Sequence, residues 1–148
     1  MNAVDQARTP EMAAKIASLT SLFREEFLGA EPDLSPWLMD GKCDDWLDPN
    51  SADVSFHLGG MHPTCRSHCV LALVHYDRLP YDSQAEVIEI EAIGFCNERE
   101  QWRVSTDGLW SFEGRMLPTE EAQEKLSNFF RGVFHLFRNS MYGPYQFR

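Results

Sequence analysis

The chain is poor in positive charge. Its 148 residues hold 23 Asp and Glu but only 13 Lys and Arg, which gives a formal net charge of −10. A surface this acidic repels phosphate groups, so nucleic acid and anionic membranes are not expected as partners. The same charge favours a protein partner whose contact patch is basic, because opposite charges steer such encounters.

Long apolar runs and an export signal are also missing. No stretch of about 18 apolar residues occurs, so a membrane-spanning helix is not expected. The first residues lack the basic patch and apolar run of a signal peptide. The four cysteines are therefore expected as reduced thiols in the cytoplasm, because disulfides persist mainly in oxidising compartments.

Two common binding motifs are absent as well. Gly59-Gly60 is followed by Met-His-Pro and not by a helix start with Lys-Ser or Lys-Thr, which argues against a nucleotide-binding loop. No Cys-x-x-Cys pair occurs, so the most specific zinc spacing is missing. No repeat or low-complexity tract divides the chain, and we expect one α+β domain over residues 1–148.

Apolar spacing predicts two long helices. In the first, Thr9 suits the N-cap and Pro10 the first helical position. Apolar residues then recur at steps of three and four over residues 12–27, and Gly29 supplies the stop. The second helix follows Thr119 near the end of the chain. Its core stripe comprises Ala122, Leu126, Phe129, Val133 and Leu136.

Between the helices the apolar period changes to two, which is typical of strands. The expected strands cover residues 54–58, 69–74 and 87–96, then a hairpin that enters at 102–104, turns at 106–108 and returns over 109–112. Short connections favour an antiparallel meander of about five strands. We therefore expect an N-terminal helix, this meander and a C-terminal helix, with the helices packed on one sheet face.

Residues 30–53 form an acidic segment that contains Trp37 and Trp46. Prolines interrupt it, so we expect a loop. In one interpretation the tryptophans fold back and cover an edge of the core, because large apolar side chains are buried on average. In the other, the segment is exposed and docks a partner, since Trp is enriched at binding hot spots.

The C-terminal helix has more apolar residues than one sheet face needs. Phe130, Phe134 and Phe137 widen its core stripe. A basic line, formed by Arg131, His135 and Arg138, follows at steps of four and three. In the simplest interpretation, these cations complement the negative C-terminal end of the helix dipole. The apolar excess instead favours a homodimer, in which the basic helix of one copy meets the acidic loop of another.

Residues 57–69 hold three of the five histidines and two of the four cysteines. His62, Cys65 and His68 have spacings that zinc can use, and Cys96 can arrive from a neighbouring strand as a fourth ligand. Cys65, beside an arginine and near two imidazoles, is also a candidate catalytic thiol. Cys69, at the start of an expected central strand, is instead expected as a small apolar core residue, as free cysteines often are.

Glu89 and Glu91 lie on one face of an expected strand. Two such carboxylates can act as an acid–base pair or bind a divalent cation. Alternating charges on a strand are more often its solvent side, and nothing near them in the sequence separates their pKa values. The isolated His75 and His135 are likewise expected to have no special role.

These observations favour a small acidic cytoplasmic domain that binds a protein and is not an enzyme, of the inhibitor, neutralising-partner or chaperone type. The expected contact residues are Trp37, Trp46, Phe130, Phe134, Phe137, Arg131 and Arg138. The alternative is a metal- or thiol-dependent enzyme that uses the cluster at 57–69. A small-molecule sensor with a pocket under the acidic loop is a third hypothesis.

Overall fold

The structure is a computed structural model that describes residues 1–38 and 47–142, except for the side chains of 138–142. In chain order the elements are α1 (Ala3–Gln6), α2 (Pro10–Glu26), β1 (Glu31–Asp33), β2 (Ser51–His57), β3 (Cys69–Tyr76), β4 (Val87–Cys96), β5 (Arg99–Ser105), β6 (Glu113–Gly114) and α3 (Glu120–Tyr142). No helix in this part of the chain combines the length and apolar character that crossing a membrane requires.

Helix α2 begins where its sequence predicts. The Thr9 hydroxyl accepts a hydrogen bond from the Met12 backbone N–H at 3.1 Å, and Pro10 occupies the first helical position. The helix ends at Glu26, and Phe27 is its C-cap. Gly29 follows with φ +85°, a conformation that glycine adopts without steric cost. The apolar stripe that faces the core is Met12, Ile16, Leu19 and Phe23.

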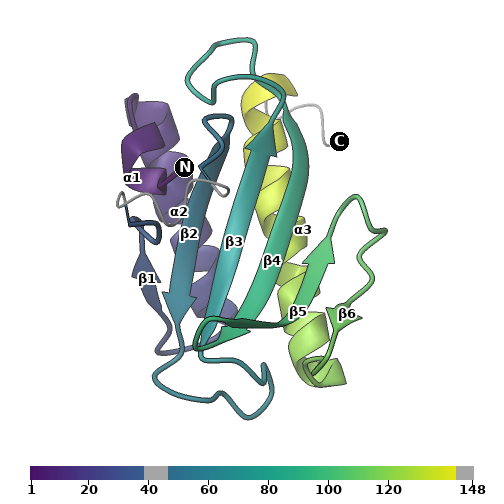
Figure 1. The fold of residues 1–148 in the computed structure, drawn as a ribbon. Helices are drawn as coiled ribbons and strands as arrows, with labels where there is room; N and C mark the ends of the chain where they lie inside the picture. The colour runs from purple at the N-terminus through teal and green to yellow at the C-terminus, as the bar shows by residue number, and fades with distance from the viewer. Residues whose placement is uncertain (39–46, 143–148) are drawn as a thin grey trace.

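The strands form one six-stranded sheet in the order β1-β2-β3-β4-β5-β6, and every neighbouring pair is antiparallel. Helices α2 and α3 lie on the same face of this sheet (Figure 1). The predicted α+β fold is thereby confirmed. The meander is longer than expected, partly because residues 31–33, assigned to the loop from their prolines and acids, pair with β2 as strand β1.

The expected return strand at residues 109–112 is wrong. Leu109 and Trp110 have φ values of +56° and +65°, which extended strands do not adopt, so the turn continues through them. The strand that pairs with β5 is β6. Gly114 in β6 approaches β5 so closely that a Cβ atom there would lie 2.2 Å from the Gln101 carbonyl oxygen.

The main core lies between the sheet and the two long helices. Phe23 of α2 stacks on Phe56 of β2 with ring centroids 4.0 Å apart. From α3, Phe130 and Phe137 are 0% and 2% exposed, and Phe134 packs partly buried against the same core. The apolar width of α3, interpreted from the sequence as a dimer surface, is therefore accounted for by packing within the chain. The homodimer itself stays a prediction.

The sheet face away from the helices, called the outer face below, carries a second small core. It consists of Leu71, Leu73 and Ile93, with Trp37 and Phe95 packed against it. Trp37 has thus folded back onto the sheet, which is the first of the two interpretations of the acidic segment. Trp46 lies outside the described residues.

Candidate functional site

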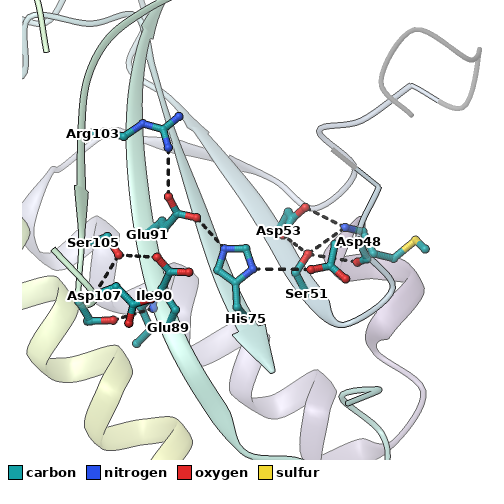
Figure 2. Close-up of polar contacts among 12 residues, drawn as sticks. Asp48, Ser51, Asp53, His75, Glu89, Ile90, Glu91, Arg103, Ser105 and Asp107 are labelled. Atoms are coloured by element: carbon teal, nitrogen blue, oxygen red, sulfur yellow. Dashed lines mark hydrogen bonds and ion pairs between the residues drawn. The ribbon is translucent and has the colours of Figure 1, made fainter. Parts of the chain in front are cut away.

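Polar side chains gather on the outer face where β3, β4 and β5 run side by side (Figure 2). Because successive residues of a strand point to opposite faces, the burial of Val74 and Ile90 in the main core turns His75, Glu89 and Glu91 outward. The antiparallel register places His75 directly opposite Glu89, with Glu91 on the diagonal. Neighbours in these positions are close enough to interact.

Five of these side chains make up what we call the outer-face cluster: Asp48, His75, Glu89, Glu91 and Arg103. His75 Nε2 lies 2.8 Å from Glu91 Oε1, and Arg103 Nη1 lies 3.4 Å from Glu91 Oε2. The Asp48 carboxylate is 3.9 Å from the other imidazole nitrogen, Nδ1. The donor atoms of His75, Glu89 and Glu91 all lie within 4.8 Å of one another.

The contacts within the cluster shift the pKa values of His75 and Glu91. The hydrogen bond to Glu91 raises the pKa of His75, and partial burial only partly opposes that rise. The same bond lowers the pKa of Glu91, with a further contribution from Arg103. The two side chains are 20% and 15% exposed, so water screens the pair only in part. An imidazolium–carboxylate pair is the favoured state below the raised pKa of His75.

A pH dependence of stability follows from these directions. Because the pKa of His75 is raised in the folded state, His75 stabilises the fold fully below pH 6.5, its ordinary pKa. This stabilisation is lost as the pH rises through the pKa of His75 in the folded state. Because the pKa of Glu91 is lowered in the folded state, Glu91 stabilises the fold above pH 4.5, its ordinary pKa. This stabilisation is lost as the pH falls through the lowered pKa. We expect His75→Gln to cost about 1 kcal/mol of unfolding free energy near pH 5.5 and less near pH 8.5, as measured by urea denaturation.

His57→Gln is the matched control. His57 Nε2 lies 3.8 Å from an Asp33 carboxylate oxygen on the same sheet face, but both side chains are exposed, at 55% and 42%. This pair is expected to contribute little at either pH. Equal losses for the His75 variant at both pH values would contradict the assignment.

The segment 57–69 does not bring its reactive groups together. Cys65 is 0% exposed, and burial raises its pKa to about 12, so the group is a neutral thiol near pH 7. His62 uses Nδ1 to accept hydrogen bonds from the backbone N–H groups of Thr64 and Cys65, both at 3.2 Å. Its ring also meets Phe27 edge to face. Both side chains thus have structural partners, and Cys65 is not the reactive thiolate that the thiol-enzyme hypothesis assigned to it.

The four candidate zinc ligands are also not assembled. Cys96 Sγ lies 3.6 Å from Met61 Sδ and 3.8 Å from the Arg66 carbonyl oxygen. Across residues 1–38 and 47–137, the one group of three or more His, Cys, Asp or Glu side chains with converging donor atoms is His75, Glu89 and Glu91. His62, Cys65, His68 and Cys96 therefore do not surround a common centre there.

The basic line on α3 borders a groove of about 740 Å³ between the two long helices. Arg131 and His135 line it together with Leu22 and Leu136. Arg131 and His135 are both exposed, whereas the side chain of Arg138 lies outside the described residues. The basic surface predicted from the sequence is thus on the helix layer, away from the outer-face cluster.

Comparison with known proteins adds a family but no activity. A family model described as a domain of unknown function matches residues 4–139, which is nearly the whole fold. The chain belongs to this family. Comparisons with curated proteins and with solved structures give no match. A functional assignment therefore has to come from the geometry of the chain itself.

Proposed function

We propose that this family member is a non-enzymatic protein-binding domain of the cytoplasm that receives a basic segment of its partner on the outer face of the sheet. The observation that carries the proposal is the outer-face cluster, where three carboxylates meet one arginine and one histidine. An inhibitor, a neutralising partner or a chaperone would each use such a surface, because charge complementarity speeds encounter and selects the partner.

The single arginine of the cluster already forms ion pairs with carboxylates of the same chain. Arg103 Nη2 lies 2.7 Å from Glu100 Oε1, and Nη1 lies 3.4 Å from Glu91 Oε2. Its positive charge is thus shared between two carboxylates of the chain. Asp48, whose side chain is 50% exposed, and Glu89 remain to attract an external cation.

The surroundings of these carboxylates suit a flat contact. The adjoining part of the outer face is the small apolar core on which Trp37 packs. Apolar and aromatic groups beside a charged rim are typical of protein interfaces. The thiol-dependent alternative receives less support, since burial raises the pKa of Cys65 to about 12.

The test uses a fluorescently labelled Lys/Arg-rich peptide and an Asp/Glu-rich peptide of the same length, with affinity measured by anisotropy. The basic peptide is expected to bind and the acidic one not to bind, and binding should weaken as salt rises. Glu89→Gln, which removes a charge and keeps the side-chain shape, is expected to lower affinity about fivefold.

Glu25→Gln is the matched control, because Glu25 is an exposed carboxylate on the helix layer. Its loss changes the net charge by the same amount but leaves the outer face intact. Equal weakening by the two variants would show unspecific attraction to an acidic protein. That result, or no binding of the basic peptide at low salt, would overturn the proposal.

A further inference from the structure

Three side chains of the outer-face cluster have the composition and placement of metal ligands. We propose that His75, Glu89 and Glu91 form a binding site for one divalent transition-metal ion of the Zn²⁺ type. This inference goes beyond protein binding and does not depend on it. It differs from the zinc site predicted from the sequence, since it uses neither a cysteine nor any of residues 57–69.

The backbone holds the three ligands in place. His75 comes from β3 and both glutamates from β4, and the two strands are hydrogen-bonded in a fixed antiparallel register. Two ligands at about 2.1 Å from a tetrahedral ion lie about 3.4 Å from each other. His75 Nε2 and Glu91 Oε1 are already 2.8 Å apart, and all three donor atoms lie within 4.8 Å. Rotation of the side chains is therefore enough to bring the three donor atoms to the spacing that one ion requires.

The imidazole is oriented as a metal-bound histidine is. Its Nε2 points toward the two glutamates, while Nδ1 faces the Asp48 carboxylate at 3.9 Å, an ion-pair distance that is longer than a hydrogen bond. A carboxylate behind the non-ligating nitrogen is typical of metal-binding histidines, because it fixes the ring orientation and makes the ligand more basic. The proton that His75 and Glu91 share is the one that an ion would replace, since metals bind neutral imidazole and ionised carboxylates.

Neighbouring groups hold the other carboxylate oxygens. Arg103 contacts Oε2 of Glu91, which leaves Oε1 facing the imidazole. The Ser105 hydroxyl donates a hydrogen bond to Oε2 of Glu89 at 2.5 Å. Both glutamates thus keep one oxygen for an ion and have the other fixed from β5, which is the arrangement of a supported ligand shell.

The ligand chemistry selects the class of ion. Mg²⁺ and Ca²⁺ bind oxygen ligands, whereas an imidazole nitrogen beside carboxylates suits Zn²⁺ and its neighbours. Two ionised glutamates and a neutral imidazole balance the charge of a divalent ion. Three protein ligands leave a fourth position for water, so we expect a weaker site than a closed four-ligand centre.

The experiment is calorimetric titration of the chelator-treated full chain with Zn²⁺ and, separately, with Mg²⁺, without any peptide. About one Zn²⁺ ion per chain is expected at this site, and no measurable Mg²⁺ binding. His75→Gln and Glu89→Gln should each weaken Zn²⁺ binding at least tenfold. His57→Gln, which removes a histidine with one carboxylate beside it on the same face, should leave the affinity unchanged.

A second measurement separates this site from binding by thiols. Co²⁺ bound by nitrogen and oxygen lacks the intense near-ultraviolet absorption of cobalt–thiolate bonds, so its spectrum reports the ligand type. The proposal is overturned by a thiolate spectrum, by Zn²⁺ binding that survives both His75→Gln and Glu89→Gln, or by no binding at all. Because peptide affinity is measured separately, each proposal can fail without the other.

Discussion

Gly94→Ala is expected to destabilise the fold by about 3 kcal/mol, a large part of the total stability of a domain of this size. Gly94 of β4 pairs with Trp102 of β5. An added Cβ would lie 2.3 Å from both Cε2 and Nε1 of the indole ring. The ring cannot move away, because it is 0% exposed and Nε1 donates a 2.7 Å hydrogen bond to the Cys65 carbonyl.

Gly108→Ala is the matched control, since a Cβ there would meet only the Ser105 carbonyl oxygen at an ordinary 3.6 Å. Its cost is expected to stay below about 1 kcal/mol. In a Trp102→Phe background the ring is smaller and has lost the indole nitrogen, so the additional cost of Gly94→Ala should shrink. Urea denaturation of the four variants and the wild type measures all of these values. Equal losses at the two glycines would contradict the close packing described here.

Asp53→Ala is expected to cost about 3 kcal/mol. Asp53 lies on the outer face of β2 and is 0% exposed. Its carboxylate accepts hydrogen bonds from the Met1 amino group at 2.8 Å, Trp37 Nε1 at 2.7 Å and Ser51 Oγ at 2.9 Å. Removal of the shared acceptor takes one hydrogen bond from each of these three donors, and the loss of hydrogen bonds at a buried position is costly. The Met1 amino group still contacts Ser51 Oγ, and Ser51 Oγ still contacts the Asp48 carbonyl oxygen.

Asp53→Asn separates charge from hydrogen bonding. Burial raises the pKa of Asp53, and its hydrogen bonds oppose that rise, so the buried charge already carries a penalty. The amide keeps one acceptor oxygen, and its cost should therefore fall below that of Asp53→Ala. Asp5→Asn, at an exposed position of α1, is expected to change the unfolding free energy by less than about 0.5 kcal/mol. A cost for Asp53→Ala as small as that would contradict the buried network.

Local features of the sequence predicted the elements well. The Thr9 cap, the first-position Pro10 and the spacing of the apolar stripe placed α2 within a residue of its observed start. Each of these signals acts through neighbours no more than four residues away. The failures at residues 31–33 and 109–112 have the same origin, because β1 and β6 are short strands defined by pairing with distant residues.

Burial was harder to predict than element type. The sequence neighbours of Cys65 predict a reactive thiol, yet Cys65 lies inside the core and its carbonyl oxygen accepts a hydrogen bond from the indole of Trp102. The phenylalanines of α3 exceed what one sheet face needs, and the structure uses them against other elements: Phe129 meets Phe23 of α2, and Phe130 meets Trp110. Depth depends on all the elements that surround a residue, and a single stretch of sequence does not contain them.

The sequence by itself determined the acidic charge, the order of the two long helices and of the main strands between them, and the face of β4 on which Glu89 and Glu91 lie, since periodicity and composition are properties of the chain alone. Only the tertiary structure decided that His75 meets them. That contact depends on the register between β3 and β4, and a slip of one residue would turn His75 to the opposite face of the sheet. Strand register is set by long-range pairing and core packing, so the candidate site emerges only when the sheet is assembled.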